Sequence, residues 1–152
     1  MFSKFIKEIS ALIILIFIID IIPCIVIAAD KITEDEGTKD ADYYFFIGIE
    51  HSRLGKVKEA VDAFKQAIRI DSDDYLAYFN LGLSYKHLSN YQDALEAFKQ
   101  SLRIKKEDAD THYMIGLTYI YLNDKGLAMD QYTILKSLDN ELANKLFNLI
   151  YP

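Results

Sequence analysis

The sequence has only one cysteine, Cys24, and it lies inside an apolar run. A single thiol excludes an intrachain disulfide framework and a metal cluster held by several thiolates. Basic residues are also fewer than acidic ones, 17 against 23, and the formal net charge is −6. Binding to nucleic acid needs clustered Lys and Arg that neutralise phosphates, and no such cluster appears along the chain. The composition therefore argues against nucleic acid as a partner.

Patterns typical of catalysis or metal binding are missing as well. The acidic run at 71–74 lacks the glycine and the distant glutamate of a calcium loop. Gly55 and Lys56 have no glycine pattern upstream that would cradle a phosphate. His87 has no cysteine or second histidine at metal-ligand spacing. Because no serine, histidine and aspartate set stands out either, we expect a protein that is not an enzyme and that uses no metal or other cofactor.

A long apolar run at residues 9–29 lies near the start of the chain. Lys4 and Lys7 precede it, whereas the segment 30–40 that follows is rich in acidic residues. Positive charge before such a run and negative charge after it favour export of everything that follows. We therefore expect an exported, periplasmic or cell-envelope protein.

Residues 1–29 fit two kinds of targeting segment. A run of about twenty apolar residues is long enough to form a single-span membrane anchor. Ala28 and Ala29 supply the small residues of a signal-peptide cleavage site, and Pro23 supplies a helix break ahead of them. We favour a cleaved signal peptide and keep the anchor as the alternative. The residues before Cys24 resemble a lipid-attachment motif poorly.

Beyond the acidic linker at 30–40, the sequence repeats with a period of 34 residues. Glycine and alanine each recur three times at this spacing, as Gly48, Gly82 and Gly116 and as Ala60, Ala94 and Ala128. The second unit is typical of two helices, at about 76–88 and 91–104, with a break at Ser89. A single helical hairpin cannot bury its apolar face, so such copies stack on one another.

The residues around each glycine follow a common pattern. The slots four before, one before and three after it hold Tyr44, Tyr78 and His112, then Ile47, Leu81 and Ile115, then His51, Tyr85 and Tyr119. In the second helices the alanine is followed by Phe64, Phe98 and Tyr132, and then by Ala67, Ser101 and Leu135. From residue 41 to about residue 140, the pattern resembles the tetratricopeptide repeat (TPR) family. The two histidines and Leu135 depart from it, and the usual closing proline is replaced.

The resemblance implies an all-α fold, a right-handed helical-hairpin solenoid of three TPR units plus a C-terminal capping helix. The TPR domain would span 41–152, with repeats at about 41–74, 75–108 and 109–140 and a capping helix at about 141–150. Within a unit, Gly82 and Ala94 would let two helices approach closely, and Phe98 would fill the space between units. Leu142, Leu146, Leu149 and Ile150 predict an apolar stripe that covers the open end, although a shortened fourth repeat would look similar.

In the TPR family the first helices line a concave groove that binds peptides. Twelve of the matching slots here form the predicted partner-binding site: Phe45, Phe46, Ile49, Leu76, Phe79, Asn80, Leu83, Tyr113, Met114, Leu117, Ile120 and Tyr121. Ser52, Arg53, Lys86, His87 and Asp110 hold further groove slots. Of the family's carboxylate clamp only Asn80 is matched, and Asp110 would repel a carboxylate, so we do not expect a chaperone-tail ligand.

The apolar lining predicts instead an amphipathic helix or an extended apolar segment of a partner protein. We therefore expect a protein–protein interaction scaffold or adaptor of the cell envelope. One alternative is an accessory subunit of a membrane-bound enzyme or secretion assembly, with membrane contact through residues 1–29. Another is a self-associating structural protein, in which a second copy or the N-terminal segment covers the groove.

Overall fold

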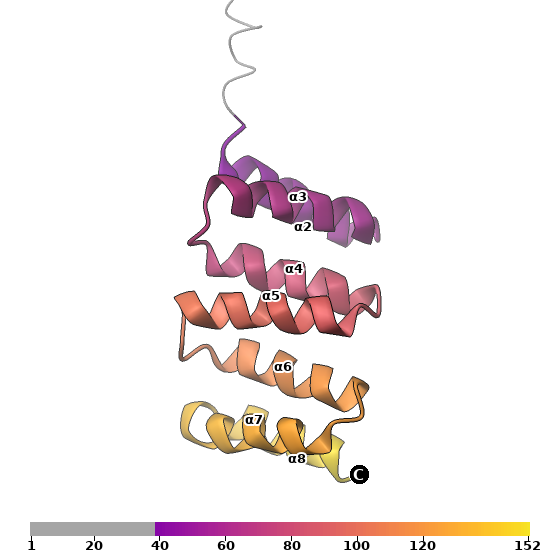
Figure 1. Cartoon of the computed structure of the whole chain (residues 1–152), viewed down its shortest axis with the longest axis vertical. Helices are drawn as coiled ribbons and strands as arrows, with labels where there is room; N and C mark the ends of the chain where they lie inside the picture. Colours follow the sequence, from indigo (N-terminus) through magenta and orange to yellow (C-terminus); the bar gives the residue numbers. More distant parts are fainter. Residues whose placement is uncertain (1–38) are drawn as a thin grey trace, which may run out of the picture. The chain divides into compact units, whose positions relative to one another are not determined.

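The computed structural model describes residues 39–152, and this part of the chain consists of seven α-helices and no strand. They are α2 (Ala41–Arg53), α3 (Val57–Ile70), α4 (Tyr75–His87), α5 (Tyr91–Ile104), α6 (Ala109–Tyr121), α7 (Lys125–Leu138) and α8 (Asn140–Ile150). Consecutive helices pair, α2 with α3, α4 with α5 and α6 with α7, and the pairs are stacked one after another (Figure 1). The predicted all-α helical-hairpin solenoid is therefore confirmed.

The predicted targeting segment at 1–29 and most of the acidic linker lie outside the described residues. Within residues 39–152, no helix is long and apolar enough to cross a membrane.

The first helix of each hairpin begins after an aspartate that caps it. Asp40, Asp74 and Asp108 lie 34 residues apart, and their side chains accept hydrogen bonds from backbone N–H groups at 2.8 to 3.1 Å. Such a cap satisfies a donor that the helix leaves unpaired, and it places negative charge at the positive end of the helix dipole. The three first helices therefore begin at equivalent positions, and their side chains stay in register from repeat to repeat.

The turn inside each hairpin also recurs with the same period. Gly55, Ser89 and Asn123 follow the first helices by the same interval, and all three have positive φ, at 73°, 61° and 60°. The backbone N–H of the next residue then reaches back to a carbonyl of the preceding helix, as from Asn90 to Tyr85 at 2.9 Å. Glycine adopts this left-handed conformation without steric cost, whereas a serine does not. The second turn is therefore mildly strained at Ser89.

In each of the first two hairpins, close contact between a glycine and a phenylalanine holds the two helices together. A Cβ atom placed on Gly82 would lie 2.5 Å from the Phe98 ring, and one on Gly48 would lie 2.6 Å from the Phe64 ring. Both rings are fully buried. The prediction that Phe98 fills the space between units needs correction, because its ring lies first against α4 of its own unit. It also joins Ile115 of the next unit in one core cluster.

The third repeat is built differently. Tyr132 holds the phenylalanine slot of α7 but is half-buried, and the atom facing Gly116 belongs to Leu146 of α8, 2.5 Å from a Cβ placed there. Leu146 is fully buried in a cluster with Leu135, the large residue that departs from the repeat pattern. A helix from outside the repeat thus supplies the side chain that α3 and α5 supply within theirs.

The short connection before α8 explains this arrangement. Only Asp139 separates α7 from α8, whereas four residues, 71–74 and 105–108, connect the earlier hairpins. The chain therefore folds back, and α8 packs against both α6 and α7. It is a capping helix rather than the first helix of a fourth repeat. Of its predicted apolar stripe, Leu146 and Ile150 are fully buried, but Leu149 is 50% exposed and does not belong to the core.

Two slots of the first helices differ between α2 and the later repeats. In α4 they hold Ala77 and Ser84, and in α6 they hold two threonines; all four are buried. In α2 the same slots hold Tyr43 and Glu50, which are larger and exposed. The small side chains allow the helices of the preceding hairpin to approach, and α2 has no preceding hairpin within the described residues.

Candidate functional site: the first-helix face

The predicted partner-binding residues all lie on α2, α4 and α6, and we call the surface that they form the first-helix face. The structure leaves four of its twelve members exposed: Phe46, Ile49, Leu76 and Tyr121. The other eight are half-buried: Phe45, Phe79, Asn80, Leu83, Tyr113, Met114, Leu117 and Ile120. The face is therefore partly a free surface and partly an outer layer of the core.

The half-buried aromatic residues contribute to both the free surface and the core. The Phe45 ring packs on Phe64 with ring centres 5.9 Å apart, and the Phe79 ring packs on Phe98 at 5.8 Å. Because Phe64 and Phe98 in turn fill the glycine contacts, the face rests directly on the rigid part of each hairpin. Truncating Phe79 would therefore disturb folding, whereas the exposed Leu76 and Ile49 lie outside the core clusters of the described residues.

A pocket of about 240 Å³ opens between the ends of α2 and α4. Its lining includes Asn80 and Leu83 of the predicted site, together with Ser52, Gly55, Val57, Ser84 and His87. Asn80 donates its amide N–H to the Leu76 carbonyl at 2.8 Å, and Ser84 donates to the Asn80 carbonyl at 2.9 Å. Pockets for whole small molecules are commonly larger than about 300 Å³, so this one has the size for a single side chain.

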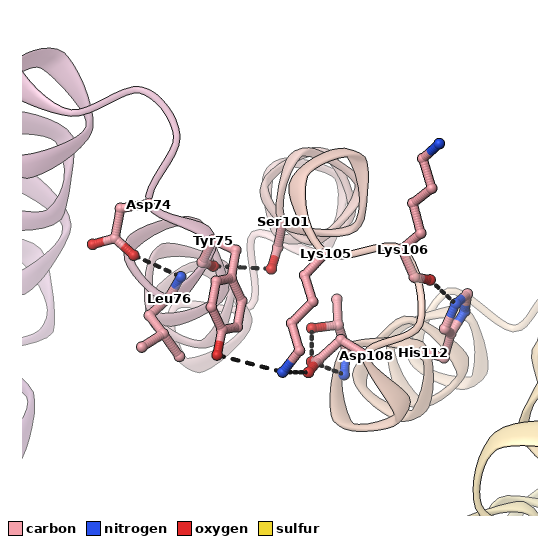
Figure 2. Close-up of polar contacts among 9 residues, drawn as sticks. Asp74, Tyr75, Leu76, Ser101, Lys105, Lys106, Asp108 and His112 are labelled. Carbon is pink, nitrogen blue, oxygen red and sulfur yellow. Dashed lines mark hydrogen bonds and ion pairs between the residues drawn. The ribbon is translucent and has the colours of Figure 1, made fainter.

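A polar joint fixes α4 relative to α6 (Figure 2). Lys105, in the connection between them, donates to the Tyr75 hydroxyl at 3.4 Å and forms an ion pair with Asp108 at 2.6 Å. The Ser101 hydroxyl, fully buried, donates to the backbone carbonyl of Tyr75 at 2.9 Å. Because Asp108 also caps α6, the joint links the starts of two first helices and sets the spacing of the first-helix face.

The charge state of the joint depends on Asp108. Burial raises the pKa of this carboxyl, but hydrogen bonds from Lys105 and Thr111 outweigh the burial and hold the pKa below its ordinary value. The Thr111 hydroxyl donates to it at 2.6 Å. The joint is therefore intact at neutral pH and is expected to weaken in acid, as Asp108 takes up a proton.

The first-helix face carries few charged side chains, and they differ in whether an opposite charge lies beside them. Arg53 forms a bidentate pair with Glu50 one turn away, at 2.9 and 2.7 Å. Lys86 is half-buried, and its Nζ lies 3.7 Å from the Met114 sulfur. Burial lowers the pKa of Lys86, and no charged group of the described residues acts on it in return. Lys86 is thus a cation without a counter-charge among residues 39–152.

The structure adds residues that the sequence analysis did not assign to the site. Val57 lines the pocket although it begins a second helix. Tyr91, which begins α5, stacks on the exposed Tyr121 with ring centres 5.1 Å apart and planes 3° from parallel. The two features are equivalent under the 34-residue period, because Val57 and Tyr91 hold one slot of the repeat and the neighbouring His87 and Tyr121 hold another. The slot of Val57 and Tyr91 lies on the second helices, and the predicted site was limited to the first helices.

The two histidines that depart from the repeat pattern lie in the helical framework. His112 is buried, and its two ring nitrogens lie 2.9 Å from the Gln131 side-chain oxygen and 3.2 Å from the Lys106 carbonyl. His51 Nδ1 is buried without a hydrogen-bond partner. Within residues 39–152, no three His, Cys, Asp or Glu side chains are grouped so that they could hold a metal ion.

Stacked hairpins with an exposed, partly apolar face on their first helices define the class of helical repeat proteins. Family models match three segments: "TPR repeat" at residues 51–89, and "Tetratricopeptide repeat" at 75–108 and at 109–141. Together they cover more than half of the chain. The protein belongs to the tetratricopeptide repeat family.

Solved structures support the fold. The first TPR domain of Spaghetti (RPAP3), solved with the HSP90 peptide SRMEEVD, is 17% identical, with a TM-score of 0.67 over 74% of this chain and 92% of that chain. The TPR protein YrrB is 22% identical, with a TM-score of 0.68 over 74% of this chain and 59% of that chain. The TPR2B domain of yeast Sti1, solved in complex with pHsp70, is 16% identical, with a TM-score of 0.68 over 75% of this chain and 95% of that chain. No curated protein matches the sequence.

Proposed function

We propose that the protein is an interaction scaffold whose first-helix face binds an apolar or amphipathic segment of a partner protein. The observation that carries the proposal is the exposure of Phe46, Ile49, Leu76 and Tyr121 along one face of three helices held in register. Apolar side chains in such an arrangement suit anchors at helical or alternating spacing. The pocket between α2 and α4 adds a place for one such anchor.

Two of the similar structures, those of the RPAP3 domain and the yeast Sti1 domain, contain peptide or protein ligands from the HSP90 and Hsp70 chaperones. Protein binding by domains of this shape supports the general role. The chemistry of those ligands is not carried over, because the clamp slots of this chain hold Phe45, Ile49, Asp110 and Met114 and only one matching residue, Asn80. The carboxyl terminus of a ligand would meet the Asp110 carboxylate at a slot where the clamp needs a cation.

The experiment selects binders from a displayed library of random twelve-residue peptides and measures their affinity for two double variants. Ile49→Ser/Leu76→Ser removes side chains that are 38% and 42% exposed, and Leu127→Ser/Ile134→Ser on α7 removes side chains that are 41% and 39% exposed. The matched exposure makes loss of fold an equal risk for both, and circular dichroism checks it.

We expect the first-helix variant to weaken peptide binding tenfold or more, about 1.4 kcal/mol, and the α7 variant to leave it unchanged. Equal losses in both variants, or no loss in either, would place the binding surface elsewhere. Failure to select any peptide would remove the support for a peptide-binding scaffold.

We further propose export to the cell envelope, which rests on the sequence of residues 1–40 alone. Lys4 and Lys7 before an apolar run and acidic residues after it are typical of an exported chain. Mass spectrometry of the N-terminus, on protein purified from its own cells, tests this directly. A start at Ala29 or Asp30 supports cleavage, an intact start in the membrane fraction supports the anchor, and an intact start in the cytosol refutes export.

A further inference from the structure

Lys86 differs from two lysines that form ion pairs with carboxylates in the described part of the chain. Lys105 pairs with Asp108 at 2.6 Å, and Lys145 pairs with Glu141 at 2.7 Å. The Lys86 ammonium instead lies 3.7 Å from the Met114 thioether, which is a weak acceptor. A half-buried ammonium gives up part of its hydration, and a thioether returns little of it. Lys86 therefore carries a cost that a carboxylate beside it would relieve.

Within residues 39–152, no carboxylate forms an ion pair with Lys86 or shifts its pKa. One turn before Lys86 lie Gly82 and Leu83, and one turn after it lie Ser89 and Asn90, so no acid occupies an i±3 or i±4 position. In the other two repeats the same slot holds Ser52 and Ile120. The cation is therefore specific to the middle of the first-helix face and is not required by the repeat.

The surroundings of Lys86 define what a ligand must bring. Leu83 and His87, on the same turn of α4, line the pocket toward α2, while the Lys86 side chain extends toward Met114 of α6. A segment that fills the pocket with one side chain therefore places its neighbouring residues beside Lys86. At the opposite end of the first helices, Asp42 and Asp110 are exposed and would repel an acid.

We propose that the partner segment carries an aspartate or glutamate next to its apolar anchor, and that Lys86 pairs with this carboxylate. The proposal rests on the proposed function and adds the charge of the ligand and the orientation in which it binds. The acidic residue lies toward the α4 C-terminus, away from Asp42 and Asp110. The pairing is with an internal side chain and uses none of the slots of the carboxylate clamp.

The test repeats the peptide selection on three proteins: the wild type, Lys86→Met and Lys86→Glu. Lys99→Met serves as the matched control, because Lys99 is exposed on the second helix α5 and its side chain makes no hydrogen bond, ion pair or ring contact within residues 39–152. Methionine keeps the aliphatic stem of lysine, so Lys86→Met removes charge with little change of shape.

We expect peptides selected by the wild type to be enriched in Asp and Glu beside an apolar residue. Their affinity should fall about threefold to tenfold for Lys86→Met and stay unchanged for Lys99→Met. Selection on Lys86→Glu should enrich Lys and Arg at the same place in the peptide.

Peptides that depend on Ile49 and Leu76 but show the same acidic content for wild type and Lys86→Met would overturn this inference and leave the scaffold function standing. If no selected peptide depends on Ile49 and Leu76, the scaffold function itself fails, and the inference fails with it. Enrichment of Lys or Arg by the wild type would also refute the assignment.

Discussion

The contact between Gly82 and the Phe98 ring predicts that adding one methyl group destabilises the protein. In Gly82→Ala the new Cβ would lie 2.5 Å from a ring atom, where ordinary van der Waals contact begins at 3.4 Å. The ring would have to shift by roughly 1 Å, and Phe98 is fully buried. Overpacking of this kind costs about 1–3 kcal/mol.

A second effect has the opposite sign. Alanine favours a helix over glycine by up to about 1 kcal/mol, so the net change at Gly82 understates the steric cost. Gly126 provides the control, because it also lies in a helix, its φ is not positive, and its nearest atom, on Asp124, is 3.5 Å away. Gly126→Ala should therefore gain stability from the higher helix propensity of alanine, without overpacking.

The quantity to measure is the difference between the free energies of unfolding of the two variants, from urea titrations followed by far-UV circular dichroism. We expect Gly82→Ala to be less stable than Gly126→Ala by about 1–3 kcal/mol. For a domain of this size each kcal/mol lowers the melting temperature by roughly 4 °C or more.

The double variant Gly82→Ala/Phe98→Leu tests the mechanism. Leucine is smaller than phenylalanine, so the added methyl group should cost less in its presence, with a coupling energy of about 0.5–3 kcal/mol. Equal stability of the two alanine variants, or strict additivity in the double variant, would refute the packing argument.

Three further predictions follow from other parts of the stack. Leu146→Ala should cost about 2–5 kcal/mol, because it empties the buried contact at Gly116, while Leu149→Ala on the exposed side of α8 should cost far less; comparable melts would contradict the assignment of α8. Ser89→Gly should raise the free energy of unfolding by up to about 1 kcal/mol, because it removes the cost of a positive φ at an exposed turn, and a loss would mean that the serine stabilises the turn in another way. Asp108 has a folded pKa below its ordinary value, so its stabilisation is complete above about pH 4 and is lost as the pH falls through the lower folded pKa. Melts of Asp108→Asn should therefore lose less stability than wild type below about pH 4, and parallel pH curves would show that the joint does not titrate.

Much of the fold could be predicted from the period of 34 residues, because each repeat meets a similar environment. The glycines and alanines that recur at this period mark where helices approach closely, and the slots of Phe64 and Phe98 mark what fills the gap. The spacing of Asp40, Asp74 and Asp108 carries the same periodic signal and identifies the capping residue in each repeat.

The packing of the third repeat could not be predicted in this way. Tyr132 holds a slot that the pattern assigns to the core, yet Leu146 occupies the contact with Gly116. The outcome depends on the length of the connection at Asp139 and on how α8 folds back, and neither leaves a periodic trace. The pocket beside Val57 was missed for a different reason, because Val57 begins a second helix and the predicted site included first helices alone.

The position of α8 determines how the array could grow in evolution or by engineering. Each interface between hairpins uses a surface that the next copy of the unit matches, so a duplicate of residues 75–108 inserted after Asp108 would keep the four-residue connections and find compatible neighbours on both sides. A copy added after α8 would not, because α8 covers the surface of the third hairpin on which that copy would have to stack. The array can therefore lengthen by internal duplication, and each inserted copy would extend the surface available to a longer ligand while the same end-piece is retained.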